Sequence, residues 1–261
     1  GKGKNNINAS LDYLVGLLKI HEIVERDYFT ELDKSTRDLC EGYAEGLNYY
    51  IEKNNNELDQ YIYPVNGKDI VAGFMYKNPF FFDLPIFISV LYSYKPSEIP
   101  QSFTINDKIN LITKGSNVFA VAPKRTNNGS TLLAINSHQP WEGDVAWYEA
   151  HIHSEEGLNI TGGLFPGSPI VLVGHNENLG WGHTVNNPDV IDIYELEINP
   201  DNENQYLFDG QWKNLEVFDV NIDINTIGKI GIIHTEPAYW SIHGPVIKGK
   251  HATYAIRYSW E

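Results

Sequence analysis

The stretch GSNVFAV at residues 115–121 separates a helical first half of the chain from a strand-rich second half. After it, short runs of β-type residues are separated by the turn signals Asn-Gly at 128–129, Glu-Gly at 156–157 and Asp-Gly at 209–210. The expected strands are 117–122, 131–136, 145–153, 170–174, 191–198 and 217–224. Because strands do not alternate with helices as a parallel sheet requires, the sequence predicts antiparallel sheets in an α+β fold.

Two helices are expected in the first half. Ser10 is the predicted N-cap of the first helix, and Ser35 with Asp38 resembles a capping box at the start of the second. Cys40 is expected to be a buried small hydrophobe between helices, because no cation lies next to it that would lower its pKa. The predicted apolar face of the second helix consists of Leu39, Cys40, Tyr43, Ala44, Leu47, Tyr50 and Ile51.

Composition excludes several partners. The 261 residues carry 19 basic against 34 acidic side chains, and a net charge of −15 argues against a nucleic-acid partner. The longest apolar stretch, 80–94, is interrupted by Asp83 and Pro85, so no membrane-spanning helix and no membrane partner are expected. No signal-peptide core follows the N-terminus, so any targeting segment is expected to lie outside this chain.

The Gly115-Ser116 junction suggests a specific chemistry. A serine hydroxyl is a poor nucleophile unless a base removes its proton. If the Gly115–Ser116 bond were cut, Ser116 would gain an α-amino group with a pKa of about 8, which could act as that base. Gly115 suits such a cut because it leaves its carbonyl open to attack and tolerates a strained backbone.

Six sequence blocks follow the junction in a fixed order. They are GSNVFAV at 115–121, TLLAINSHQPW at 131–141, WYEAHI at 147–152, GLFPGSP at 163–169, GHN at 174–176 and GWGHT at 180–184. Together they resemble the start of the β-chain in the penicillin acylase family of N-terminal-nucleophile hydrolases. Upstream, GYAEGLN at 42–48 is similar to a helix of that family's α-chain.

The resemblance implies roles for particular residues. Ser116 would be the nucleophile and, through its freed amine, the general base. His138 stands where the family places the residue that hydrogen-bonds this amine, and Val185 stands where a backbone N–H forms half of the oxyanion hole. The other half, an asparagine side chain, and a supporting arginine are expected beyond Glu261, so the chain is expected to be a fragment.

The resemblance also implies an organisation. Residues 1–115 would be a helical α-chain segment with a spacer, and residues 116–261 the N-terminal part of the β-chain. These α and β chains would be partners from one precursor, folded as an N-terminal-nucleophile αββα sandwich with antiparallel sheets. No cofactor is required for the chemistry, and the expected location is periplasmic or secreted.

Two groups of residues have side chains that could bind a metal. The acidic run at 189–192 resembles an element with which several family members bind calcium, and it would place Asp189, Ile191 and Asp192 at a structural Ca²⁺ site. The start of a plain solvated strand explains the same residues equally well. His151 and His153 alternate onto one strand face, but without a third ligand in pattern a structural role is favoured over zinc.

The substrate is less constrained than the reaction. The expected substrate is a small acyl-amide, with an N-acyl-homoserine lactone favoured and a β-lactam or lipopeptide left as alternatives. Gln139 replaces the bulky apolar residue of many relatives, which weakens the expectation of a long acyl chain. The aromatic segment 80–87 could line an acyl pocket, although core packing is favoured. A non-catalytic, β-rich binding module is the rival from another functional class.

Overall fold

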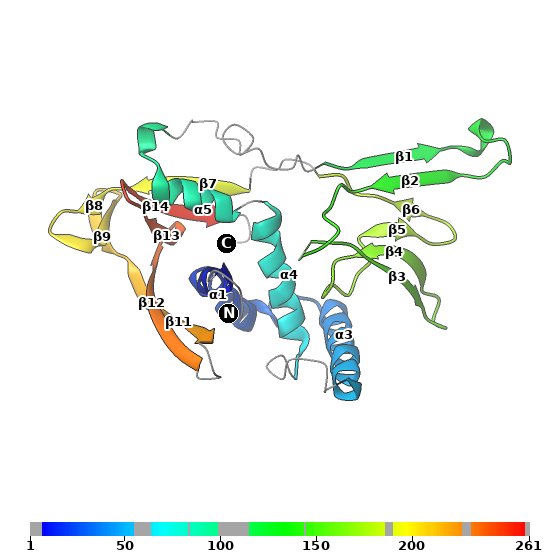
Figure 1. Cartoon of the computed structure of the whole chain (residues 1–261), viewed down its shortest axis with the longest axis horizontal. Coiled ribbons are helices and arrows are strands. Elements are labelled where there is room, and N and C mark those ends of the chain that lie inside the picture. The colour runs from blue at the N-terminus through cyan, green and yellow to red at the C-terminus, as the bar shows by residue number, and fades with distance from the viewer. Residues whose placement is uncertain are drawn as a thin grey trace. The chain divides into compact units, whose positions relative to one another are not determined.

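A computed structural model describes residues 7–54, 64–82, 84–98, 115–143, 145–185, 190–225 and 231–258 (Figure 1). The chain forms two compact units: the first contains 1–23, 82–109 and 188–261, and the second contains 24–81 and 110–187. Helices combine with antiparallel sheets in both units, which confirms the α+β class. Each unit draws on both sides of the Gly115–Ser116 junction. This division concerns packing and does not test the predicted chain boundary, which stays a prediction.

The first unit is built around a five-stranded antiparallel sheet in the order β11-β12-β13-β14-β7. Its strands are β7 (Ile191–Leu196), β11 (Glu216–Asn225), β12 (Gly231–Ser241), β13 (Gly244–Lys248) and β14 (Thr253–Tyr258). A three-stranded sheet adds β8 (Ile198–Asn199), β9 (Asn202–Phe208) and β10 (Gln211–Asn214). One buried cluster consists of Leu196, Tyr206, Val246 and Ala255 from these strands and Leu215 between β10 and β11.

Helix α1 (Ile7–Leu17) packs against β11 and β12 of this sheet. A Cβ added to Gly16 would lie 2.5 Å from Cγ1 of Val220, so only glycine allows this approach. The Trp240 indole N–H donates to the carbonyl of Leu17, and the Tyr13 hydroxyl donates to the carbonyl of Pro237 at 3.0 Å. Helix α5 (Leu84–Ser93) packs on β13. Within the described residues, no helix combines the length and apolar character needed to cross a membrane.

The second unit contains helices α3 (Lys34–Lys53) and α4 (Gly67–Phe81), a two-stranded sheet and a four-stranded sheet. The first sheet pairs β1 (Asn117–Val121) with β2 (Leu132–Asn136), and the second has the order β3-β4-β5-β6. The strands of the second sheet are β3 (Tyr148–His153), β4 (Asn159–Leu164), β5 (Val173–His175) and β6 (Gly180–Trp181). Helix α2 (Ile20–Asp27) spans the boundary between the units.

Polar contacts fasten α4 to α3. The Asn48 side chain donates to the carbonyl of Val65 at 2.7 Å and accepts from its N–H at 2.9 Å. The Glu41 carboxylate accepts from the Tyr28 hydroxyl and from the Gly67 N–H, both at 2.9 Å. These bonds hold the start of α4 against the side of α3.

The predicted buried cysteine is confirmed. Cys40 packs with Ala44 and Ile70 between α3 and α4, and burial is the main cause that raises the pKa of its thiol. The predicted apolar face of α3 is too wide, however. Leu39 is 45% exposed and Tyr50 is 59% exposed, so the buried stripe consists of Cys40, Ala44 and Ile51.

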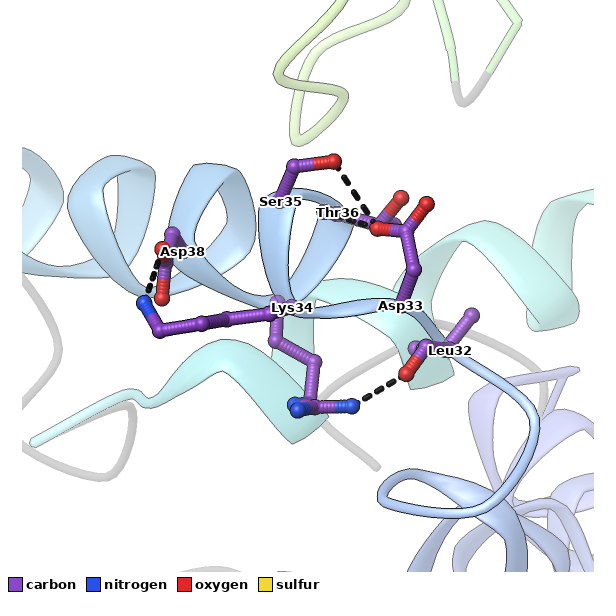
Figure 2. Close-up of polar contacts among 7 residues, drawn as sticks. Leu32, Asp33, Lys34, Ser35, Thr36 and Asp38 are labelled. Carbon is purple, nitrogen blue, oxygen red and sulfur yellow. Dashed lines mark hydrogen bonds and ion pairs between the residues drawn. The ribbon is translucent and has the colours of Figure 1, made fainter.

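Both predicted N-caps are wrong. Helix α1 begins at Ile7, which puts Ser10 inside the helix. Helix α3 is capped by Asp33, whose carboxylate accepts from the Thr36 N–H at 2.7 Å and from the Ser35 hydroxyl at 2.9 Å (Figure 2). A carboxylate can accept both bonds at once, so Asp33 outcompetes Ser35 as the cap.

Most predicted strands are confirmed with shifted ends. The predictions 117–122, 131–136, 145–153, 191–198 and 217–224 correspond to β1, β2, β3, β7 and β11. The prediction 170–174 is displaced, because β5 begins only at Val173. The Asp209-Gly210 turn is confirmed: both residues have positive φ, 51° and 73°, and they join β9 to β10 as a two-residue hairpin loop.

Candidate active site

The pairing of β1 with β2 brings Ser116 and His138 to the same end of one hairpin. Asn117 lies opposite Asn136 in the antiparallel register, so the residue before β1 and the residues after β2 share that end. Ser116 is half-buried and His138 is exposed. Two predicted site residues that are far apart in sequence are therefore neighbours in the second unit.

The side chain of Ser116 bonds back to the preceding residue. The Ser116 hydroxyl donates to the carbonyl oxygen of Gly115 at 2.7 Å. A Cβ added to Gly115 would lie 3.2 Å from Nδ1 of His138, which is closer than an ordinary contact. The absent side chain of Gly115 thus leaves room for the imidazole.

The predicted reason for glycine at this position requires a correction. Positive φ occurs at six other glycines but not at Gly115, so its backbone is not in the left-handed region that only glycine occupies readily. Space for the neighbouring ring, rather than backbone strain, is what the structure shows glycine to provide here.

Asn136 and Asn117 contact His138, although the sequence motifs do not identify either as a site residue. The backbone N–H of His138 donates to Oδ1 of Asn136 at 3.0 Å. Nε2 of the imidazole lies 3.5 Å from Nδ2 of Asn117. The pattern Asn-x-His after a predicted strand is a detectable signal, since Asn side chains commonly bond the backbone two residues on.

The segment that carries Val185 approaches this hairpin from one face. A Cβ on Gly180 would lie 2.4 Å from Cδ2 of Leu133, and a Cβ on Gly182 would lie 2.8 Å from Cγ2 of Val118. Because Val118 is nearer than Leu133 to the Ser116 end of the hairpin, residues 180–182 run toward that end. Val185 is half-buried, and its role as an oxyanion donor stays a prediction.

The calcium prediction is only partly covered by the structure. Asp189 lies outside the described residues, while Ile191 and Asp192 belong to β7 in the first unit. Asp192 is exposed and lies opposite Arg257 of β14 in the register, so the two side chains project to the same face of the sheet. Among described side chains, no group of three His, Cys, Asp or Glu converges as a metal site. The calcium site stays a prediction, and no catalytic step depends on it.

The histidine pair on β3 has ordinary partners. His151 and His153 are both exposed, and Nε2 of His151 lies 2.7 Å from Oδ1 of Asn159 on the adjacent strand β4. This contact favours the structural role predicted for the pair.

Phe81, from the aromatic segment 80–87, packs against another aromatic side chain. The ring centroids of Phe81, at the end of α4, and Phe165 lie 6.4 Å apart. The ring of Phe165 stacks on that of Trp147, with centroids 4.5 Å apart and an interplanar angle of 18°. Lys77 of α4 donates to the carbonyl of Pro166 at 2.8 Å in the same loop. For Phe81, aromatic packing is thus what the structure shows.

Comparison with known proteins identifies relatives. The family model described as penicillin amidase matches residues 3–261. An acyl-homoserine lactone acylase PvdQ of Pseudomonas fluorescens strain Pf0-1 is 28% identical over 81% of this chain and 29% of its own length. Aculeacin-A acylase of Actinoplanes utahensis is 29% identical over 41% of this chain and 14% of its own length.

A solved structure also matches. Thermostable penicillin G acylase from Alcaligenes faecalis gives a TM-score of 0.47 at 29% identity, over 57% of this chain and 26% of that chain. The chain therefore spans less than a third of the length of these relatives. Since the family match extends over nearly all of the sequence, the chain belongs to the penicillin amidase family.

Proposed function

We propose that this chain forms the nucleophile-bearing part of an amide hydrolase that cuts itself between Gly115 and Ser116. The observation that carries the proposal is the 2.7 Å contact between the Ser116 hydroxyl and the Gly115 carbonyl oxygen, with the His138 ring packed beside Gly115.

Self-cleavage would follow from this arrangement in two steps. The Ser116 oxygen attacks the Gly115 carbonyl carbon, its proton passes to the departing nitrogen, and the C–N bond breaks to leave an ester. Water then hydrolyses the ester, which gives a carboxylate on Gly115 and a free α-amine and hydroxyl on Ser116. His138 is placed to hold a proton or a hydrogen bond beside this junction.

Substrate hydrolysis would reuse the same hydroxyl. The free amine, with a pKa of about 8, takes the Ser116 proton as the oxygen attacks the substrate amide carbon. The N–H of Val185 would donate to the oxyanion, and loss of one such donor costs on the order of 10²–10³ in rate. The substrate amine leaves with the proton, and water releases the acid from the acyl-serine.

An N-acyl-homoserine lactone is the proposed substrate. Support comes from several relatives named acyl-homoserine lactone acylases that are 28–32% identical, whereas an aculeacin acylase matches a shorter part of the chain. A lipopeptide or a β-lactam amide is the alternative. The periplasmic or secreted location, and the division into α and β chains, belong to the same proposal.

Intact mass measurement of the complete polypeptide tests the cleavage. Two chains that meet at Gly115/Ser116 are expected, and Ser116→Ala should remain one chain. A single uncut wild-type chain with no acylase activity would overturn the proposal and favour a non-catalytic binding module. For the processed protein, release of homoserine lactone is compared with turnover of penicillin G; turnover of penicillin G alone would remove the proposed substrate.

A further inference from the structure

His138 has a backbone conformation that its own side chain does not favour. Its φ is +39°, and outside glycine such values are uncommon because Cβ then crowds the backbone. His138 lies two residues after the end of β2. Its ring reaches across to Gly115, which lies two residues before the start of β1. Some other group must therefore stabilise the turn that directs the ring.

Asn136 supplies this stabilisation. Its Oδ1 accepts the N–H of His138 at 3.0 Å, a side-chain bond to the backbone two residues on that replaces the next rung of the β1–β2 ladder. The bond acts at the residue whose φ is unusual. The side chain of Asn136 therefore determines where the backbone of His138 lies.

Asn117 contacts the ring itself. Its Nδ2 lies 3.5 Å from Nε2 of His138, while the other ring nitrogen, Nδ1, faces Gly115. Asn117 and Asn136 are direct cross-strand partners, so their side chains project to the same face of the hairpin. When the Asn117 amide donates to Nε2, the proton of a neutral ring is on Nδ1, toward the junction.

We infer that Asn136 and Asn117 are positioning residues for His138: Asn136 fixes its backbone and Asn117 fixes the orientation of its ring. The inference rests on the proposed function, because it gives these asparagines a role in self-cleavage and acyl transfer. Neither residue is assigned contact with the substrate.

The test measures self-cleavage and steady-state kinetics of the complete polypeptide. Asn136→Ala removes the acceptor, and we expect both the cleavage rate and kcat to fall by about 10- to 100-fold, as for a catalytic group displaced by up to 1 Å, with KM changed by less than about twofold. Asn136→Asp keeps an acceptor oxygen in the same place and should restore most of the rate.

The hairpin offers a matched control at its other end. Oδ1 of Asn128 accepts the N–H of Ser130 at 3.1 Å, which is the same type of bond in the loop that joins β1 to β2. Asn128→Ala should change the melting temperature about as much as Asn136→Ala but leave cleavage and kcat unchanged. Equal kinetic effects of the two substitutions would show that Asn136 is merely structural and would overturn its part of the inference.

For Asn117 the separation of kcat from KM is the decisive readout. Asn117→Leu removes the amide that faces Nε2 but keeps a side chain of similar size, and we expect the cleavage rate and kcat to fall by about tenfold while KM changes by less than about twofold. Asn117→Gln keeps an amide N–H and should recover part of the lost rate.

Different results would overturn the proposed function and the positioning role of the asparagines. If the wild-type chain is not cut at Gly115/Ser116, the proposed function fails whatever the asparagines do. If the wild type is cut but Asn136→Ala and Asn117→Leu behave like the wild type, only the positioning role is lost. Equal losses of rate in Asn117→Leu and Asn117→Gln would overturn the assignment of Asn117 to the ring.

Discussion

Substitution of Gly115 by alanine should slow self-cleavage without harming the processed enzyme. The added Cβ would lie 3.2 Å from Nδ1 of His138, whereas ordinary contacts lie at 3.4–4 Å. The ring would therefore have to retreat by about 0.2–0.8 Å, and a misplacement of 1 Å costs on the order of 10²-fold. On a logarithmic scale, the expected slowing of cleavage is about tenfold, within a range of about 3- to 40-fold.

A pulse-chase experiment with intact mass detection measures this rate on the complete polypeptide. Gly73→Ala is the matched control, because the space around Gly73 in α4 is open and its substitution should leave cleavage unchanged. After cleavage, residue 115 is no longer covalently attached to Ser116, so kcat per processed molecule should equal that of the wild type. The reasoning is refuted if Gly115→Ala is cut at the wild-type rate, or if its processed form shows a lower kcat.

Other expected outcomes concern stability. Gly174→Ala should destabilise the protein by more than about 3 kcal/mol in urea denaturation, because its Cβ would lie 2.3 Å from a carbonyl oxygen of β4; a loss below about 1 kcal/mol would show that β5 can move away. Asp33→Ala should cost about 1 kcal/mol through loss of the α3 N-cap, whereas Asp33→Asn should cost less. Burial and the Glu41 carboxylate raise the pKa of Tyr28 from 10.0 to about 12. The folded state thus holds this proton more tightly, so its contribution to stability is complete below pH 10 and is lost as pH rises to about 12. Tyr28→Phe should reduce this alkaline loss in thermal melts, and an unchanged loss would assign it to other groups such as Tyr258, whose pKa burial also raises to about 12.

Turn chemistry was the most reliable guide to the fold. Asp209-Gly210 has a backbone reason to form a two-residue hairpin loop, and the structure places positive φ at both residues. The helix caps were harder, because a serine near a helix start competes with any carboxylate close by, as Asp33 does with Ser35. The local sequence pattern alone does not determine which side chain caps the helix.

The missed strands show where periodicity gives no signal. β13 has a continuous run of buried residues at 244–247, so apolar and polar positions do not alternate along it. β4 contains Gly162 and Gly163, which weaken β-propensity. Gly162 is nevertheless required, since a Cβ there would lie 2.0 Å from the carbonyl oxygen of Val173 on β5. Only the three-dimensional contact explains these glycines.

The candidate site was predictable in its residue types but not in its contacts. The ordered sequence blocks pointed to Ser116 and His138, and the hairpin register explains why these residues meet. The space that Gly115 leaves for the imidazole, and the two asparagine contacts to His138, depend on how two strands face each other. No spacing along one strand contains that information.

The interleaved composition of the two units has a consequence for a chain that is nicked at residue 115. Helix α1 of the first unit packs on strands beyond residue 190, through contacts such as those of Tyr13 with Pro237 and of Trp240 with Leu17. Cutting one peptide bond would therefore not free either piece, because each unit contains segments from both sides of the cut. The two fragments should stay associated after the cut and separate only in denaturant.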